Sequence, residues 1–248
     1  SYVQSMHSVQ YDKLKLVQRG EIWCCRAQNV NLPVVTRVHS RARRMVLRVS
    51  PCGQEIRLTL PKHARQNRAF EFLKAQLPWL EQQLVMRPEP ILLEPGSKVR
   101  LFGRMCELRH DPMMIGVRYT GARLTVGGSP EHFSRRIQDA IRKEAIDRFG
   151  DIARTMAAKL DKRIAGFGVR EMQSRWGSCT SDRRLSINWR LAFAPKEVAN
   201  YVIAHEVAHL RYFDHSPKFW ETVQILNKQM VKSREWLAEH GSELHRYR

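Results

Sequence analysis

One short segment near the C-terminus, His205-Glu206-Val207-Ala208-His209, constrains the fold of this chain more than any other. Side chains four residues apart lie one above the other on the same face of an α-helix. In that conformation the two imidazoles can share one metal ion, with the Glu206 carboxylate beside the first. The segment therefore predicts a helix that contributes two ligands to a metal site.

The flanking residues favour the same helix. Pro195 and Glu197 are typical of a helix start, because proline suits the first turn and an acid suits the positive end of the dipole. Apolar and imidazole side chains then recur at spacings of four, three and four, at Val198, Val202, His205 and His209. The alternative is a pair of core histidines bonded to backbone carbonyls. We favour a metal, because one ion satisfies both inward-facing rings and unpaired buried polar groups are costly.

A third ligand is expected shortly after this helix. His215 follows His209 by six residues, so it would face away from the metal if the helix continued. However, Ser216-Pro217 predicts a second helix start, and a turn near Asp214 would bring His215 back over the site. Asp214 itself and the more distant Glu221 are alternative third ligands. We favour His215, because imidazole is the commonest metal ligand.

Three neutral imidazoles would leave the full charge of Zn²⁺ and one open position for water, whose pKa such a metal lowers to about 7. Glu206 lies about 60° around the helix from His209 at 100° per residue. From there its carboxylate can act as a general base toward that water. The alternative role for Glu206 is a hydrogen bond that only orients a ligand.

Four blocks occur in order around these residues, at positions 174–179, 185–191, 201–210 and 215–220. Together they resemble the YgjP-like family of predicted zinc metallopeptidases, which is similar in its catalytic half to SprT-type proteases. The resemblance extends over roughly residues 35–240. It implies a zincin-like active site, with His205, His209 and His215 as zinc ligands and Glu206 as catalytic acid and base. It implies no particular substrate.

A hairpin is expected just before the metal-binding helix. Residues 169–176 and 185–189 have extended patterns, and polar residues 180–183 separate them. An edge strand beside the active helix can bind an extended peptide by backbone hydrogen bonds, and Trp176, Gly177 and Ser178 are the candidate substrate-binding residues. Gly177 would allow close backbone approach. The alternative is that Trp176 is a core aromatic and Gly177 a bulge.

Basic residues are in large excess: 43 Lys and Arg face 24 Asp and Glu, for a net charge of +19. Arginines gather at Arg37, Arg41, Arg43 and Arg44, and again at Arg183, Arg184 and Arg190. Such a surface can bind nucleic acid nonspecifically through phosphates, or attract an acidic substrate. The alternative is a basic surface without a partner.

Five cysteines, an odd number with no Cys-x-x-Cys pair, favour reduced thiols and hence a cytoplasmic location. No apolar run approaches the roughly 18 residues that span a bilayer, so no membrane association is expected. Oligomeric state has no signature in the sequence.

Periodicity predicts the remaining organisation. Strands are expected within residues 33–60 and 98–126, and helices over 65–86, interrupted near Pro78, and over 131–164. The order predicts an α+β fold with a β-rich N-terminal half and a zincin-like helical catalytic half, which has a small sheet or hairpin beside the active helix. The expected parts are an extension at 1–30, a β-rich subdomain at 31–129 and a metallohydrolase domain at 130–248.

The favoured interpretation is a zinc metallopeptidase that cleaves a peptide or protein substrate with metal-activated water and Glu206 as the base. A metal-dependent phosphohydrolase acting on nucleotides is one alternative, which the positive charge favours. A nucleic-acid-associated module with a structural zinc is another. Three ligands and a water argue against this last alternative, because structural zinc sites usually close all four positions.

Overall fold

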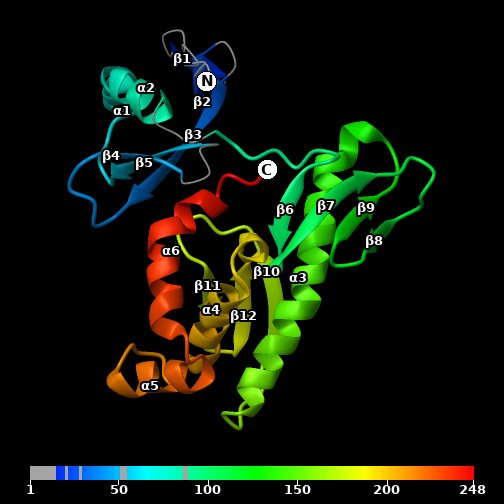
Figure 1. The fold of residues 1–248 in the computed structure, drawn as a ribbon. Helices are drawn as coiled ribbons and strands as arrows, with labels where there is room; N and C mark the ends of the chain where they lie inside the picture. Colours follow the sequence, from blue (N-terminus) through cyan, green and yellow to red (C-terminus); the bar gives the residue numbers. More distant parts are fainter. Residues whose placement is uncertain (1–14, 20–21, 28–29, 51–54, 86–88) are drawn as a thin grey trace, which may run out of the picture. The chain divides into compact units, whose positions relative to one another are not determined.

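The computed structural model of this chain describes residues 15–19, 22–27, 30–50, 55–85 and 89–248. Its helices and small sheets confirm the α+β class (Figure 1). The chain divides into two compact units, Ser1–Glu89 and Pro90–Arg248, and each has a buried apolar core of its own. Within the described ranges, none of the helices combines the length and the apolar character that crossing a membrane requires.

The N-terminal unit is a five-stranded sheet with two helices. In sheet order its strands are β1 (Lys15–Arg19), β2 (Ile22–Ala27), β3 (Val30–His39), β5 (Ile56–Pro61) and β4 (Val46–Val49). The helices are α1 (Gln66–Ala75) and α2 (Leu77–Val85). Alternate side chains of β5, Ile56 and Leu58, are fully buried and share a core with Leu73 and Leu80 of the helices. The alternating pattern of the sequence thus becomes one buried face of the sheet.

Two expectations for this unit are corrected. The extension expected at 1–30 contains strands β1 and β2, because Trp23 and Cys25 are buried in the sheet's core; residues 1–14 lie outside the described residues. The second correction concerns position only: the interruption expected near Pro78 is present, but the break between the two helices falls at Gln76. Pro78 is the second residue of α2, where its missing N–H has no helical partner to lose.

The C-terminal unit combines two small sheets with four helices (Figure 1). The first sheet has the order β6 (Lys98–Leu101), β7 (Arg104–His110), β9 (Arg123–Val126) and β8 (Val117–Tyr119). The second has the order β10 (Gly166–Arg170), β12 (Arg184–Asn188) and β11 (Gly177–Cys179). The helices are α3 (Phe133–Ala158), α4 (Lys196–Ala208), α5 (Pro217–Leu226) and α6 (Met230–Leu244).

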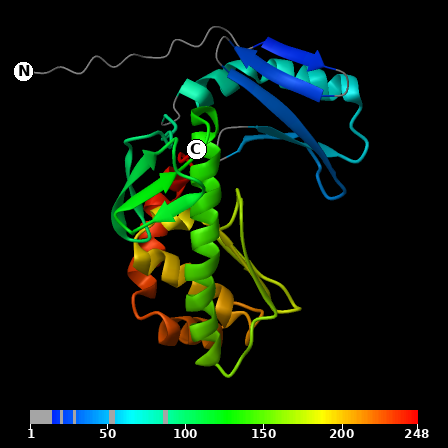
Figure 2. The same cartoon turned by 90° about the vertical axis from the view of Figure 1, so that its right-hand side faces the viewer.

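Helix α3, the long green helix of Figure 2, joins both sheets and α4 into one core. Its expected apolar stripe is confirmed, since Ile137, Ile141, Ala145 and Phe149 are all buried. Leu108 and Leu124 of the first sheet lie in the same core cluster. The domain boundary expected between residues 129 and 130 therefore falls inside this unit. The boundary between the two compact units lies between Glu89 and Pro90 instead.

The hairpin expected before α4 is present. Strands β11 and β12 pair antiparallel, with Gly177 opposite Ile187 and Cys179 opposite Leu185, and residues 180–183 form the turn. Strand β10 pairs in parallel with the other side of β12, so the extended run expected to reach Trp176 ends at Arg170. This order leaves β11 at the edge of the sheet, in contact with α4.

Arg190, which the sequence suggested as part of a basic surface, is buried and forms an ion pair with Glu171. The other Glu171 oxygen accepts a hydrogen bond from Trp189 Nε1 at 2.8 Å. The guanidinium carbon of Arg190 lies 4.8 Å from the centroid of the Trp189 ring. Sequence could not reveal this, because a buried arginine is distinguished from a solvated one only by a partner distant along the chain.

We expect Glu171→Ala to lower the free energy of unfolding by about 2–4 kcal/mol, because it leaves the buried Arg190 guanidinium without its carboxylate. The matched control is Glu107→Ala, which removes an acid whose partners Arg109 and Arg123 are about half exposed. Such surface pairs contribute about 0–1 kcal/mol. Urea denaturation followed by circular dichroism measures both; equal losses would contradict the role of Glu171 as the partner of the buried Arg190 guanidinium.

Candidate metal centre

Helix α4 carries the first histidine where the sequence predicts it. The helix begins at Lys196, directly after Pro195, and Glu197 lies in its first turn. Val198 and Val202 are buried in the unit's core, and His205 and His209 are half-buried on the continuation of the same stripe. The apolar positions thus fix the rotation of the helix, and the imidazoles emerge at the margin of the core.

The chain turns after α4 and brings a third imidazole back. Helix α4 ends at Ala208, and bends at Phe213 and Asp214 lead to Ser216, which precedes α5 at Pro217. The second helix start is therefore where the sequence predicts it. His215 lies just before this start, and its ring centroid is 5.1 Å from that of His205 and 5.0 Å from that of His209.

The three histidines form the group, among the described residues, that could hold a metal ion. One ring nitrogen from each of His205, His209 and His215 lies within 4.8 Å of the others. The Nε2 atoms of His205 and His215 are 3.2 Å apart. Two nitrogens bound to one tetrahedral Zn²⁺ at 2.0–2.1 Å would be ~3.3 Å apart. Asp214 and Glu221, the alternative third ligands, do not belong to this group.

His209 is oriented by its other ring nitrogen. Its Nδ1 lies 3.0 Å from the Tyr212 carbonyl oxygen, which can accept only from a protonated nitrogen. That bond places the proton on Nδ1 and leaves the Nε2 lone pair available. Metal-binding histidines are typically held in this way by a carbonyl or carboxylate. The donor set therefore fits a zinc ion: three imidazoles close together, one with its tautomer already determined.

An aromatic wall from α5 supports the cluster. Phe219 is fully buried, and its ring centroid lies 4.9, 4.6 and 4.8 Å from those of His205, His209 and His215 respectively. Trp220 packs on the side of His205 and His215, at 5.6 and 5.7 Å. Phe219 is a site residue that was not expected from the sequence. The spacing of four between His215 and Phe219, on a helix start, is a signal that could have done so.

Burial and neighbouring cationic groups lower the pKa of His205 and of His209. Burial, together with His209, His215 and Arg234, lowers the pKa of His205 to about 4. Burial also lowers the pKa of His209, although its bond to the Tyr212 carbonyl opposes that shift. Neutral imidazole is the form that binds a metal. The site therefore disfavours protonation, which would compete with the metal.

Glu206 lies in the interior beside strand β11. Its side chain is buried, and burial raises its pKa to about 7, against the opposing effect of the Arg175 guanidinium. A β-carbon built on Gly177 would lie 2.6 Å from both Cγ and Oε1 of Glu206. Only a residue without a side chain leaves space for this carboxyl group. Gly177 is therefore in direct contact with Glu206 and determines the space available to it.

The three candidate substrate-binding residues have different surroundings. Trp176 packs inward, with its ring centroid 4.8 Å from that of His245, and its carbonyl accepts from the Asn188 N–H at 2.8 Å. Ser178 faces Ser186 at a hydrogen-bonded position of the ladder, since backbone bonds flank it on both sides two residues away. Gly177 and Cys179 then direct their backbone groups to the free edge of β11.

Two arginines beside the site were not singled out by the sequence analysis. Arg175 lies close enough to Glu206 to lower its pKa, and Arg234 of α6 acts on both His205 and Tyr201. The guanidinium carbon of Arg234 is 5.2 Å from the centroid of the Trp220 ring. In a chain this rich in arginine, nothing local distinguishes these two from the rest.

In this α+β chain, α4 and its C-cap bring two histidines close to a third, and a buried glutamate follows the first, which is the arrangement typical of metallohydrolases. The model of the YgjP-like family, described as a metallopeptidase domain, matches residues 43–240. This chain therefore belongs to the YgjP-like family. No curated protein matches the chain, and no solved structure matches it.

Proposed function

We propose that this protein is a zinc-dependent peptidase whose metal is held by His205, His209 and His215. The observation that carries the proposal is the gathering of three imidazole nitrogens within 4.8 Å, at the margin of the core. The buried Glu206 follows the first of them in sequence. Membership of a metallopeptidase family supports the class of reaction. The lowered pKa values of His205 and His209 and the tautomer of His209 support a divalent ion with a preference for nitrogen.

A bound zinc ion would supply Lewis-acid polarisation of the scissile carbonyl and would lower the pKa of a water to about 7. Glu206 then has the role of general base: its carboxylate accepts the proton of the attacking water and delivers it to the leaving amine. Gly177 holds the carboxylate in place from the side of β11. Phe219 and Trp220 exclude water from the back of the histidines.

The substrate would bind as an extended strand along β11. The backbone groups of Gly177 and Cys179 lie at the free edge of the three-stranded sheet, and β11 contacts α4. Backbone bonds at an edge strand hold a peptide without regard to its side chains. This arrangement favours a peptide over a nucleotide as the substrate, since a nucleotide has no backbone that could continue a sheet.

Zinc analysis of histidine variants tests the ligand set. We expect wild-type protein to bind zinc in a one-to-one ratio, and His215→Ala to bind it at least about 100-fold more weakly, because even the loss of a supporting residue costs 10–100-fold. The control is His240→Ala, since His240 stacks on Trp236 outside the cluster. Competition with a chelating indicator measures the affinities. Unchanged affinity in His215→Ala would return Asp214 and Glu221 to consideration.

Two substrate panels, used with the same zinc-loaded protein, identify which kind of bond is cleaved. Quenched fluorescent peptides of random sequence should be cleaved, and nucleoside di- and triphosphates should release no phosphate. Phosphate release without peptide cleavage would replace the peptidase with a phosphohydrolase. Neither activity, with zinc still bound tightly, would favour a structural role for the metal.

A further inference from the structure

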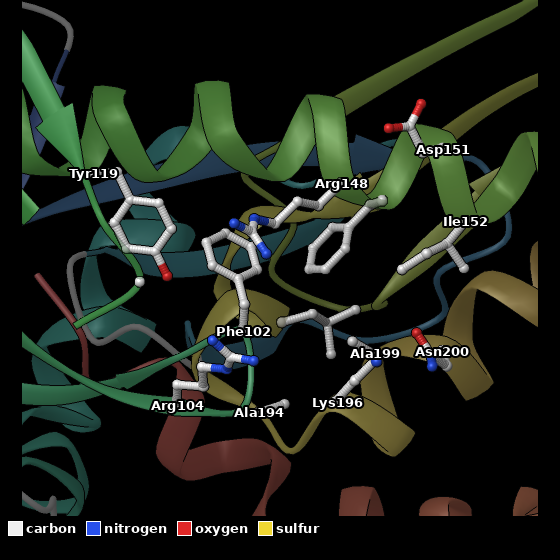
Figure 3. Close-up of a pocket in the computed structure, with 13 residues that line it drawn as sticks. Phe102, Arg104, Tyr119, Arg148, Asp151, Ile152, Ala194, Lys196, Ala199 and Asn200 are labelled. Atoms are coloured by element: carbon white, nitrogen blue, oxygen red, sulfur yellow. The ribbon is translucent and has the colours of Figure 1, made fainter. Parts of the chain in front are cut away.

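A hollow lies within the C-terminal unit, and none of the three histidines lines it. Its volume is about 440 Å³, within the roughly 300–1,000 Å³ typical of small-molecule sites. Its walls come from the turn between β6 and β7, the turn between β8 and β9, helix α3 and the start of α4 (Figure 3). No part of the proposed reaction uses this pocket.

The pocket and the metal centre lie on opposite sides of α4. Lys196 and Asn200 of α4 line the pocket, and His205 follows them by nine and five residues respectively. These spacings correspond to about 7–14 Å along a helix and place His205 about 140–180° around its axis from both residues. A ligand in this pocket is therefore separate from a peptide bound at the histidines, and its binding does not depend on the proposed peptidase activity.

The charges around the pocket are unbalanced. Arg104, Arg148 and Lys196 line it, and Arg148 is paired with Glu144 at 2.5 Å. The acidic lining residue, Asp151, is paired with Arg154 at 2.7 Å, and its carboxylate points away from the hollow in Figure 3. Among the described residues, no carboxylate lies within ion-pair distance of Arg104 or Lys196. Two positive charges are therefore unmatched.

The aromatic wall of the pocket includes Phe102, whose backbone conformation is unfavourable for a bulky residue. Phe102 has φ +50° and Gly103 has φ +83°, as in the two-residue hairpin turns that usually contain Asn-Gly. A bulky residue in this region costs about 1–2 kcal/mol, and packing keeps it there. The Phe102 ring lies edge-on to Tyr119 and Phe149, with centroids 6.1 and 5.7 Å away.

Polar groups converge on that ring. The guanidinium groups of Arg104 and Arg148 and the hydroxyl of Tyr119 gather around Phe102 in Figure 3. The guanidinium carbon of Arg148 is 5.1 Å from the Phe102 centroid and 5.4 Å from that of Tyr119. Burial raises the pKa of the Tyr119 hydroxyl, which therefore keeps its proton and can donate a hydrogen bond.

We propose that this pocket binds a small phosphate monoester whose organic part is apolar. A phosphate monoester carries about −1.5 to −2 charges at pH 7, which matches the two unmatched cations. Guanidinium groups bind phosphate through two parallel hydrogen bonds, and Lys196 adds a point charge. A carboxylate would leave one cation unmatched. The Phe102, Ile152 and Leu191 side chains would receive the organic part of the ligand.

Calorimetric titration of the zinc-loaded full chain with phenyl phosphate, in about 150 mM salt, tests this site. We expect saturable one-to-one binding of phenyl phosphate, weaker binding of benzoate and none of phenol. Arg104→Met and Lys196→Met, both at exposed positions, should each weaken binding at least about tenfold, because each removes a charge-assisted hydrogen bond. Thermal unfolding of each variant verifies that it is folded.

The matched control is Arg118→Met, which removes the same charge from β8 of the same sheet but outside the pocket. Its affinity for phenyl phosphate should stay within about twofold of wild type. Absence of saturable binding, or an equal loss in Arg118→Met, would overturn the proposal. Tighter, Arg104-dependent binding of single-stranded RNA would also overturn it and would assign the pocket to a nucleic-acid surface.

Discussion

Glu206→Gln is expected to lower kcat for peptide cleavage by about 10²–10⁴-fold while zinc binding stays unchanged. The amide has nearly the shape of the carboxylate but cannot accept a proton from water. Glu206 is not one of the three residues that form the metal-binding group, so its replacement removes no proposed ligand. The effect should therefore appear in kcat with the metal content constant.

The thermal stability of Glu206→Gln distinguishes a loss of turnover from a loss of folded protein. Glu206 is buried, and burial raises its pKa to about 7, which means that the charged form is disfavoured there. A neutral amide removes that penalty, so the variant should unfold at the same temperature as wild type or above it.

The control for this substitution is Glu221→Gln, at an exposed position on α5, which should keep full activity. Kinetics on the same fluorescent peptide and metal analysis of each preparation measure both properties. Wild-type turnover in Glu206→Gln would exclude Glu206 as the base. Loss of zinc together with activity would instead assign Glu206 the role of orienting a ligand.

Gly177→Ala is expected to lower kcat/KM more than tenfold and the free energy of unfolding by about 1–3 kcal/mol, because the new methyl group overpacks a buried contact. The added carbon would lie 2.6 Å from Glu206 Cγ and Oε1 and 2.8 Å from Cδ. The backbones of Gly177 and Glu206 belong to β11 and α4, two elements of the core, so the Glu206 side chain has to move. A displaced carboxylate no longer meets the attacking water.

Gly168 provides a matched control in the same sheet. A β-carbon built there meets nothing within 4 Å, and Gly168 lies on β10, on the far side of β12 from β11. Gly168→Ala should leave activity unchanged and stability within about 0.5 kcal/mol of wild type. Full activity in Gly177→Ala would show that β11 does not hold the Glu206 carboxylate in place.

A double-mutant cycle tests whether the stability lost in Gly177→Ala comes from the contact between residue 177 and Glu206. In the background of Glu206→Ala there is no side chain for the new methyl group to displace, so Gly177→Ala should cost much less stability there than in wild type. A coupling of about 1 kcal/mol or more is typical of residues in contact. Additive losses would mean that the alanine disturbs the backbone of β11 rather than Glu206.

The local sequence pattern was sufficient to predict the elements that carry the proposed ligands. The spacing of His205 and His209 and the apolar positions Val198 and Val202 fix one face of a helix, and Ser216-Pro217 begins the next helix. The hairpin of β11 and β12 also follows from a short alternating pattern and a polar turn. These features depend on residues close together in the chain, so periodicity alone determines them.

Other properties depended on partners far apart in the sequence. The contact of Gly177 with Glu206, the burial of Arg190 against Glu171 and the position of Phe219 behind the histidines all join separate elements. Strands β1 and β2 likewise became visible only through the pairing of β1 with β2 and of β2 with β3.

The sequence by itself determined that two imidazoles and a carboxylate lie on one helix and its C-cap, because helical geometry repeats every few residues. Only the tertiary structure decided that His215 returns to them, that β11 presses against Glu206 and that cations converge at the other end of α4. Those outcomes depend on how the elements pack into one core, and the packing of distant side chains leaves no periodic trace in the chain.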